Sequence, residues 1–498
     1  MNHSRHTDIP QTQPAEAAPL DVLVVGSGFS GIAMGIELRR AGIRSFVLLE
    51  RADGPGGTWR DNVYPGAACD IPSHLYSFSF EPNPGWSRHF SPQAEIRAYL
   101  QHCIAKYGLA PHLSYGQEVT RARFDGASAR WHVETRAGAR FAARALVLGN
   151  GPLSNPALPR IPGLADFDGQ LFHSARWPAG WSVRGQRVAV IGTGASAIQI
   201  VPELAREAAR VEVFQRTPPW ILPRHDHAIP ATMRRAFLRH PRLHRAYRGW
   251  LYWRYELRAL GFTVHRSLLA PGRWMALWHL RRQVADPALR RRLTPDYPIG
   301  CKRVLLSDDY YPALQRPNVT LVTTGIERVT PCGIATRDGV EHAVDAIVLA
   351  TGFAATEYLS TIRIEGAGGR CLASAEEPLP AAYLGISISG FPNLFLLMGP
   401  NTGLGHNSMV FMIEAQARYA RQAVQALLAR DHAALEVRET VQRRFQSRIE
   451  ARLARSVWNS GCSSWYLKDG RNPVIWPGFT FEYWWKTRRL RERDFAWR

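Results

Sequence analysis

Lysine is scarce in this chain of 498 residues, with only four lysines among 62 basic residues against 41 acidic ones. The formal net charge of +21 therefore comes almost entirely from arginine. We interpret this skew as a coding bias, and the basic side chains as solvated faces rather than a nucleic-acid footprint. Denser basic stretches at 234–258, at 281–292 and at the C-terminal end leave attraction to anionic membranes or phosphate ligands open.

Closely spaced cysteines are also lacking, since the six cysteines form no CxxC motif. Their spacing argues against a disulfide scaffold, a zinc site or a dithiol reductase and favours a reducing compartment. Residues 1–19 are polar, which predicts a disordered tail and not a signal peptide. The longest uncharged run, 378–413, is interrupted by proline, glycine and asparagine and predicts no transmembrane helix. We expect a cytoplasmic protein, as a monomer or small homo-oligomer.

A nucleotide-binding pattern opens the folded part with "LDVLVVGSGFSGIAMGIELRRAGIRSFVLLE". An apolar run typical of a strand precedes the glycines, and a helical pattern follows them. Gly26 permits a tight turn, Gly28 lets the backbone approach a pyrophosphate, and Gly31 lets the helix pack against the strand. The next apolar run ends in Glu50, where a carboxylate binds ribose hydroxyls. This first site is predicted to hold FAD or NAD and to disfavour a 2′-phosphate.

The same pattern recurs in "RVAVIGTGASAIQIVPELAREAARVEVFQRTPPW". Gly192 and Gly194 form the turn, and Ala197 takes the place of the third glycine. The following strand ends without an acid, in Arg216 and Thr217, and a guanidinium binds a 2′-phosphate through charge-assisted hydrogen bonds. The second site is therefore predicted to prefer NADPH, with an ordinary surface arginine as the alternative. Two such sites in one chain predict a flavin redox enzyme with an α/β fold of two Rossmann-like domains.

An arginine- and tryptophan-rich segment, 228–295, interrupts the second nucleotide-binding pattern with apolar spacings typical of amphipathic helices. Three interpretations stay open for it: it shapes substrate access, it only packs over the sheet, or it contacts a membrane surface. We expect a disordered tail (1–19), a first part of the FAD domain (20–178), an NADP domain in two pieces (179–227 and 296–345) around this insertion, and a second part of the FAD domain with the C-terminal segment (346–498).

The stretch "FDGQLFHSARWP" between the two patterns carries Phe167, Gly169, His173, Trp177 and Pro178 at fixed offsets. With this fingerprint the sequence resembles the Baeyer–Villiger monooxygenases, FAD- and NADPH-dependent enzymes with two Rossmann domains. The resemblance extends to "GNGPLSNPALPRIPG", "LATGF" and "GFPNLFLLMGPNTGLGHNS". The later "CSSWYLKDGRNPVIWPGFTF" is similar to the subgroup of 4-hydroxyacetophenone-type enzymes.

The resemblance implies that NADPH reduces FAD, that O2 adds to the flavin as a peroxide, and that this peroxide converts a ketone or aldehyde into an ester or lactone. It implies Asp70, in "YPGAACDIPSHLYSF", and Arg303, in "YPIGCKRVLL", as the catalytic residues. Arg303 cannot lose its proton, so it stabilises the deprotonated peroxide. From the residues alone, a turn residue or an N-cap is the favoured interpretation of Asp70.

Lys302 is expected to add charge near the 2′-phosphate, and His173 to have a combined structural and cofactor role. Trp465 matches a family tryptophan near NADP, with ordinary packing as the alternative. The stretch "RHDH" at 224–227 is interpreted as a basic loop and not as a metal site. The cofactor contacts predicted at the two sites are Gly26, Gly28, Phe29, Gly31, Glu50, Gly57, Thr58, Trp59, Tyr76, Val119, Met409, Gly192, Gly194, Ala195, Ser196, Gln199, Arg216, Thr217, Lys302, Trp465 and His173.

Two other functions remain as alternatives. One is a heteroatom monooxygenase that oxygenates amines or sulfides through a protonated flavin hydroperoxide. The other is a flavoprotein that no longer oxygenates and serves as an NADPH-binding or redox-sensing module. Asp70, Arg303 and the Trp177-Pro178 pair favour the Baeyer–Villiger reaction over both.

Overall fold

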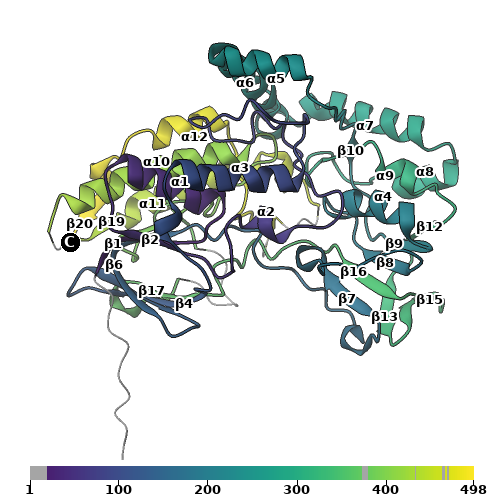
Figure 1. Cartoon of the computed structure of the whole chain (residues 1–498), viewed down its shortest axis with the longest axis horizontal. Coiled ribbons are helices and arrows are strands. Elements are labelled where there is room, and N and C mark those ends of the chain that lie inside the picture. Colours follow the sequence, from purple (N-terminus) through teal and green to yellow (C-terminus); the bar gives the residue numbers. More distant parts are fainter. Residues whose placement is uncertain (1–18, 373–379, 432, 463–465, 468–469) are drawn as a thin grey trace, which may run out of the picture.

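A computed structural model of the chain describes residues 19–372, 380–431, 433–462, 466–467 and 470–498. Two bodies lie side by side, each built around its own sheet (Figure 1). The tail predicted over residues 1–19 lies outside the described residues except for Pro19.

An eight-stranded sheet forms the centre of the first body. Its strand order is β17-β4-β5-β6-β1-β2-β3, with β18 also paired to β6. The strands are β1 (Leu20–Val25), β2 (Phe46–Leu49), β3 (Leu113–Ser114), β4 (Val119–Asp125), β5 (Arg130–Thr135), β6 (Arg140–Leu148), β17 (Arg363–Glu365) and β18 (Leu394–Leu396). In the parallel centre, Val24 lies opposite both Leu48 and Val147 and is fully buried. Burial on both faces explains why these strands are unbroken apolar runs.

Helices from both ends of the chain cover one face of this sheet (Figure 1). They are α1 (Phe29–Arg40), α3 (Gln93–Lys106) and α10 (Met409–Leu428). The C-terminal part also supplies α11 (Glu439–Ala454), α12 (Thr480–Thr487) and the small antiparallel pair of β19 (Leu435–Val437) and β20 (Phe495–Trp497). The chain thus returns to the first body after it has formed the second.

A five-stranded parallel sheet forms the second body, in the order β12-β9-β8-β16-β7. Its strands are β7 (Gln170–His173), β8 (Arg187–Ile191), β9 (Arg210–Phe214), β12 (Val319–Val322) and β16 (Ala346–Leu349), and α4 (Ala197–Glu207) packs against it. Two expected boundaries are corrected by this pairing, because β7 falls before the boundary at 178 and β16 after the boundary at 345. β16 pairs with β7 on one side and with β8 on the other, both distant in sequence, so that Leu349 lies opposite both His173 and Ile191.

The fingerprint 167–178 is a packing unit at the edge of this second sheet. A Cβ atom at Gly169 would lie 2.4 Å from the Asp345 backbone oxygen and 2.6 Å from the Phe167 ring, so only glycine fits there. His173 is buried and donates from Nε2 to the Gly352 carbonyl at 2.9 Å, while its Nδ1 accepts from the Ala175 N–H at 3.1 Å. Because backbone groups engage both ring nitrogens, His173 ties β7 to the "LATGF" segment.

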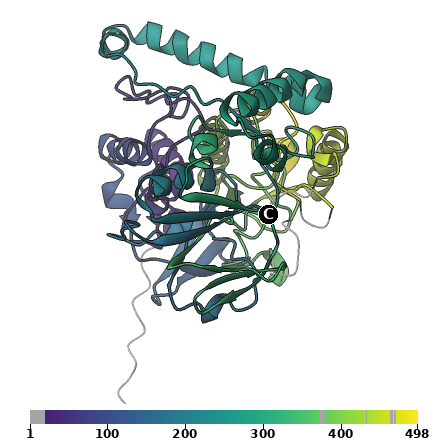
Figure 2. The same cartoon turned by 90° about the vertical axis from the view of Figure 1, so that its right-hand side faces the viewer.

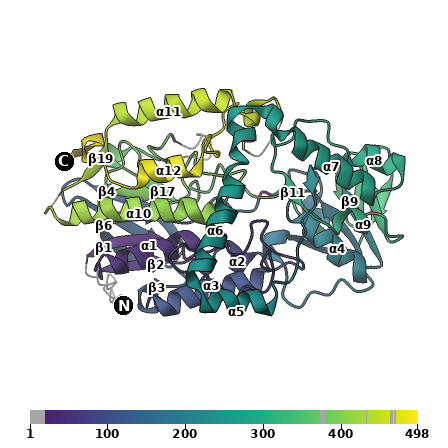
Figure 3. The same cartoon turned by 90° about the horizontal axis from the view of Figure 1, so that it is seen from above.

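Four α-helices occupy the span in which the sequence predicts an amphipathic helical region, and they lie above both sheets (Figures 2 and 3). They are α5 (Ala231–Arg239), α6 (Pro241–Glu256), α7 (Ala270–Gln283) and α8 (Pro287–Leu293). The chain enters this helical region after β10 (Ile221–Leu222) and leaves it before β11 (Leu305–Leu306), and these two strands pair with each other. None of the helices that the structure describes is long and apolar enough to cross a membrane.

Candidate cofactor and active site

A large cleft opens at the carboxyl ends of β1, β2 and β6 and encloses about 1560 Å³ of empty space, its open mouth included. Its lining contains every residue predicted for the first dinucleotide site except Gly31: Gly26, Gly28, Phe29, Glu50, Gly57, Thr58, Trp59, Tyr76, Val119 and Met409. The structure therefore brings together residues spread over nearly 400 positions of the sequence. Their contact with a bound dinucleotide stays a prediction.

The glycine loop of the first site is shaped by close backbone contacts. Gly26 has a φ of 96°, and a Cβ atom there would lie 2.8 Å from the Gly149 carbonyl oxygen. A Cβ atom at Gly31 would lie 1.9 Å from the Gly26 oxygen, so Gly31 serves helix–strand packing. The N-cap of α1 is Gly28, which has no side chain to bond the first N–H groups, and the first helical residues Phe29 and Ser30 line the cleft. Backbone N–H groups at the start of this helix suit a phosphate group.

Glu50 follows β2 and is buried at the wall of the cleft. Its Oε2 atom accepts hydrogen bonds from the N–H (3.0 Å) and hydroxyl (2.6 Å) of Ser27, and its Oε1 atom accepts one from the Ala52 N–H at 3.1 Å. These bonds fix the carboxylate beside the glycine loop, the place expected for ribose hydroxyls. A carboxylate here accepts hydrogen bonds from ribose hydroxyls and repels a 2′-phosphate, so the site fits a dinucleotide without that phosphate.

Aromatic side chains form a further part of the cleft wall. The Trp59 indole donates a hydrogen bond of 3.1 Å to the Tyr76 hydroxyl, and the Tyr76 ring lies edge-on to Phe29 with centroids 5.2 Å apart. Burial raises the pKa of Tyr76, so its hydroxyl stays protonated. These three residues combine an apolar surface with a fixed hydroxyl, which suits a planar ring system such as a flavin.

The predicted catalytic residues form one ion pair, although they stand far apart in the sequence. Arg303 donates from Nε to Asp70 Oδ2 at 2.9 Å and from Nη2 to Asp70 Oδ1 and Oδ2 at 2.8 and 2.6 Å. The Asp70 carboxylate raises the pKa of Arg303, which is therefore a permanent cation. Arg303 also lines the cleft, so its charge is presented where the first dinucleotide is expected.

Tyr466 is a cleft residue that the sequence analysis missed. It is buried, and it interacts with the Arg303 guanidinium. Burial raises the pKa of Tyr466 to about 12, so the phenol stays neutral. Its neighbour Trp465, a predicted NADP contact, lies outside the described residues. The pair Trp465-Tyr466 in "SSWYLKDG" was the available signal, because aromatic residues with a polar atom often line ligand sites.

A disulfide joins Cys301 to Cys462, with Cα atoms 6.4 Å apart, a pairing that the cysteine spacing did not predict. The two residues are 161 positions apart, so no local pattern could show that the fold brings them together. The bond connects the segment of Arg303 to the segment that precedes Tyr466. The disulfide therefore links two parts of the chain that meet at the cleft.

The second glycine loop follows β8 in the second body. Gly192 has a φ of 116°, and a Cβ atom there would lie 2.5 Å from the Ala350 carbonyl oxygen. Gly194 and Ala195 are exposed at the start of α4, with Ser196 half-buried behind them. Gln199 connects the two bodies, since it accepts from the Tyr64 hydroxyl at 3.0 Å and donates to the Ala68 carbonyl at 2.9 Å.

Two cations lie near each other beside this second loop. Arg216 is exposed at the end of β9, and Thr217 follows it, its carbonyl oxygen accepting from the Thr193 hydroxyl at 3.0 Å. Burial and, after it, the positive charge of Arg216 lower the pKa of Lys302. The Lys302 ammonium lies 4.5 Å from the centre of the Tyr297 ring. A doubly charged phosphate between Arg216 and Lys302 would relieve their repulsion.

His173, the remaining predicted cofactor contact, does not line the cleft. Burial lowers its pKa, so the imidazole is neutral near pH 7. Both of its ring nitrogens are already hydrogen-bonded to backbone groups, at Gly352 and Ala175.

The chain resembles known proteins over nearly its whole length. Residues 23–235 match the family model described as pyridine nucleotide-disulphide oxidoreductase. A Baeyer–Villiger monooxygenase of Pseudomonas aeruginosa is 47% identical over 486 residues, covering 97% of this chain and 92% of that protein. The chain belongs to the Baeyer–Villiger monooxygenase family.

Solved structures of this type match this Baeyer–Villiger monooxygenase closely. Oxidised steroid monooxygenase bound to NADP is 32% identical, with a TM-score of 0.86 over 96% of this chain and 99% of that one. OTEMO in complex with FAD and NADP is 27% identical, with a TM-score of 0.87 over 97% and 100% of the two chains. The predicted fold class with its two Rossmann domains and the cofactors FAD and NADPH are thereby confirmed.

The enzyme is thus a flavin monooxygenase that uses NADPH and O2 to insert oxygen next to a carbonyl group. The alternatives of heteroatom oxygenation and of a redox-sensing module receive no support from these relatives.

Proposed function

We propose that Asp70 and Arg303 are the catalytic pair of this Baeyer–Villiger monooxygenase, and that a small ketone or aldehyde binds against Arg303 in the cleft. The observation that carries the proposal is the position of Arg303, which lines the same cleft as the glycine loop and Glu50 while Asp70 holds it in place. A flavin ring bound there would lie beside a fixed positive charge.

FAD, once bound and reduced by NADPH, supplies the activation of O2. Arg303 stabilises the negative charge that develops on oxygen, and it does so without giving up a proton because Asp70 raises its pKa. An oxygen nucleophile that stays deprotonated attacks a carbonyl carbon. A protonated one would instead favour transfer to nitrogen or sulfur.

Asp70 has a positioning role in this proposal. It binds the Nε and Nη2 edge of the guanidinium and does not engage Nη1. A planar fork held along one edge has a fixed orientation, which lowers the entropy lost when an oxygen is bound to it. The neutral hydroxyl of Tyr466 beside the same guanidinium completes the polar part of the site.

At the second site, Arg216 and Lys302 bind the 2′-phosphate of NADPH. The exposed Gly194 and Ala195 provide backbone for the pyrophosphate, and Thr217 contributes a hydroxyl. Lys302 and Arg303 are adjacent in sequence, so a phosphate bound by Lys302 at the second site also constrains the backbone that carries the catalytic Arg303. We expect the enzyme to act in the cytoplasm, as a monomer or small homo-oligomer.

The experiment is a substrate screen with the purified yellow protein. NADPH consumption is followed with a panel of ketones, aldehydes, amines and sulfides, and the products are identified by mass spectrometry. We expect esters or lactones from carbonyl compounds. Sulfoxides or amine oxides as the only products, with every ketone untouched, would overturn the proposed function.

A further inference from the structure

Large apolar side chains gather on the solvent side of α6, α7, α12 and the turns between α6 and α7. We call this surface the tryptophan face. Its members are Leu243, Trp250, Trp253, Leu257, Leu260, Val264, Leu268, Trp274, Met275, Trp278, Phe481, Trp484 and Trp485, all of them exposed. Trp274 is the extreme case at 76% exposure. Soluble proteins rarely expose so many large apolar side chains together, and such surfaces mark interaction sites.

The spacing along α6 shows that its exposed side is itself an apolar stripe. Leu243, Trp250, Trp253 and Leu257 recur at intervals of three, four or seven residues, the spacing of one helix face. The buried stripe of the same helix is different and contains His244, Leu251 and Tyr255. Packing onto the body of the protein therefore explains one stripe of α6 and leaves the tryptophan-bearing stripe in solvent.

Helix α12 is fixed to α6 by the buried carboxylate of Glu256, the last residue of α6. Glu256 Oε2 accepts hydrogen bonds of 2.7 Å from the Thr480 hydroxyl and the Asn407 amide, and Oε1 accepts from the Phe481 N–H at 3.2 Å. The rings of Trp253 and Phe481 have centroids 6.1 Å apart. The two helices thus present their aromatic residues as one rigid surface, and Figure 3 shows α6, α7 and α12 from the same side.

The charge around the tryptophan face is mostly positive, and on α12 the acidic Glu482 is paired with Arg452 at 2.8 Å. Between residues 231 and 283 the sequence has twelve arginines and a single acidic residue, the buried Glu256. Arginines lie over exposed tryptophan rings on each helix: Arg254 over Trp250 at 5.3 Å, Arg282 over Trp278 at 5.3 Å and Arg488 over Trp485 at 3.4 Å. Each pair places an apolar ring next to a cation at the protein surface.

We propose that the tryptophan face docks this enzyme peripherally on an anionic membrane surface. Tryptophan and arginine side by side suit the headgroup region, where indole rings enter the interface and guanidinium groups bind lipid phosphates. Each arginine near an anionic surface strengthens binding roughly fivefold at physiological salt. The proposal selects the membrane-surface contact from the three interpretations left open by the sequence of 228–295.

Other occupants fit the face less well. A second copy of the chain would set arginine against arginine, which opposes association. A nucleic acid would pair with the arginines but would leave Leu257, Val264 and Leu268 without apolar partners. Only a lipid surface matches the aliphatic, aromatic and basic members together.

The test measures binding of the full-length FAD-loaded enzyme to vesicles that contain phosphatidylglycerol and to vesicles of phosphatidylcholine alone. We expect sedimentation with the anionic vesicles, a blue shift of tryptophan fluorescence, and weaker binding at high salt. The double variant Trp250→Ala, Trp274→Ala should lose at least roughly tenfold in vesicle affinity. Its turnover of a water-soluble ketone should not change, because neither residue lines the cleft.

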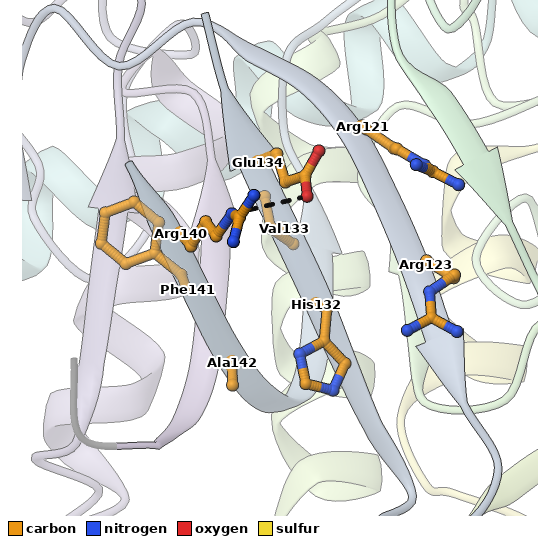
Figure 4. A pocket seen from close by; sticks show the side chains of 8 residues that line it. All are labelled: Arg121, Arg123, His132, Val133, Glu134, Arg140, Phe141 and Ala142. Carbon is orange, nitrogen blue, oxygen red and sulfur yellow. Dashed lines mark ion pairs between the residues drawn. The ribbon is translucent and has the colours of Figure 1, made fainter. Parts of the chain in front are cut away.

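A matched pair of charge variants separates the face from overall charge. Arg254→Gln with Arg282→Gln removes two charges from the tryptophan face and should weaken vesicle binding roughly 25-fold. The control Arg123→Gln with Arg140→Gln removes two charges from the outer side of β4–β6, where both arginines line a shallow cavity of about 680 Å³ and Arg140 pairs with Glu134 at 3.7 Å (Figure 4). The control should bind vesicles as the unchanged enzyme does.

Three results would overturn the proposal. The first is that the enzyme binds both kinds of vesicle equally or binds neither kind. The second is vesicle binding that survives the tryptophan substitutions. The third is an equal loss of vesicle affinity in the two double-arginine variants. A dimer in sedimentation that dissociates when Trp250 and Trp274 are replaced, without vesicle binding, would assign the face to self-association. Preferential binding of RNA or of an acidic protein would likewise contradict a lipid partner.

Discussion

Asp70 and Arg303, 233 residues apart, are joined by three hydrogen bonds of 2.6 to 2.9 Å at the wall of the cleft. The geometry makes the carboxylate the element that orients the guanidinium. Everything proposed about oxygen transfer depends on that orientation, so the pair is the first target for substitution.

Replacing Asp70 by alanine should lower kcat for ester formation roughly tenfold or more, because each charged hydrogen bond contributes about 1.5–3 kcal/mol. Asp70→Glu should restore part of the loss. Steady-state assays with NADPH and a ketone measure the effect. The control Glu439→Ala breaks an exposed helix pair with Arg443 and should leave kcat unchanged. An unaltered kcat in Asp70→Ala would contradict the positioning role.

Cofactor preference tests the second site. Arg216→Ala and Lys302→Ala should each raise KM for NADPH roughly tenfold or more and leave KM for NADH unchanged, because only NADPH carries the 2′-phosphate. Arg206→Ala is the control, since this exposed arginine pairs with Glu203 on α4. A matching increase in KM for NADH would show that these residues support the fold of the site instead of reading the phosphate.

The fingerprint glycine is predicted to be essential for stability. Gly169→Ala would place a Cβ atom 2.4 Å from the Asp345 carbonyl oxygen, and we expect the free energy of unfolding to fall by about 2–4 kcal/mol. Thermal unfolding measures the change. Gly126→Ala, where no atom lies within 4 Å of the added Cβ, should change Tm little. Equal melting temperatures for the two variants would rule out the packing explanation.

Acid should destabilise the contact between α6 and the loop that precedes Tyr76. His74 Nδ1 and His244 Nε2 share a hydrogen bond of 2.8 Å, and burial lowers the pKa of His74 to about 3 and of His244 to about 4. Because the unfolded histidines bind protons near pH 6.5 and the folded ones do not, this stability is complete above pH 6.5 and is lost as the pH falls toward 4. The slope is up to about 1.4 kcal/mol per pH unit for each histidine.

Denaturant unfolding between pH 7 and 4 measures this slope. His244→Gln keeps a donor and an acceptor beside His74 but cannot bind the proton, so its stability should depend less steeply on pH. A variant with the same slope as the unchanged enzyme would assign the acid sensitivity to other groups.

The parts of the site that sequence could predict are those encoded locally. A glycine loop, its strand and the carboxylate of Glu50 lie within 31 residues, and strand geometry alone places them at one sheet edge. The replacement of that acid by Arg216 and Thr217 is equally local. Asp70 and Arg303 were assigned only through the family resemblance, because no periodicity relates two loops of different domains.

Features that depend on contacts between residues distant in the sequence could not be predicted from local sequence patterns. Strands β7 and β16 fall on the wrong side of the expected domain boundaries because their partners are set by sheet pairing. The Cys301–Cys462 disulfide and the approach of Tyr466 to Arg303 arise where the C-terminal segment folds back onto the cleft. Burial of one stripe of α6 and exposure of the other likewise required the structure.

Oxygen insertion beside Arg303 is tested most directly by turnover under ¹⁸O2 with NADPH and a ketone substrate. The unchanged enzyme should give an ester that carries ¹⁸O, with NADPH consumed in proportion. Arg303→Ala should still oxidise NADPH through the flavin but form no labelled ester. Labelled ester from Arg303→Ala at an undiminished rate, or hydrogen peroxide as the only product of the unchanged enzyme with every ketone, would contradict the account.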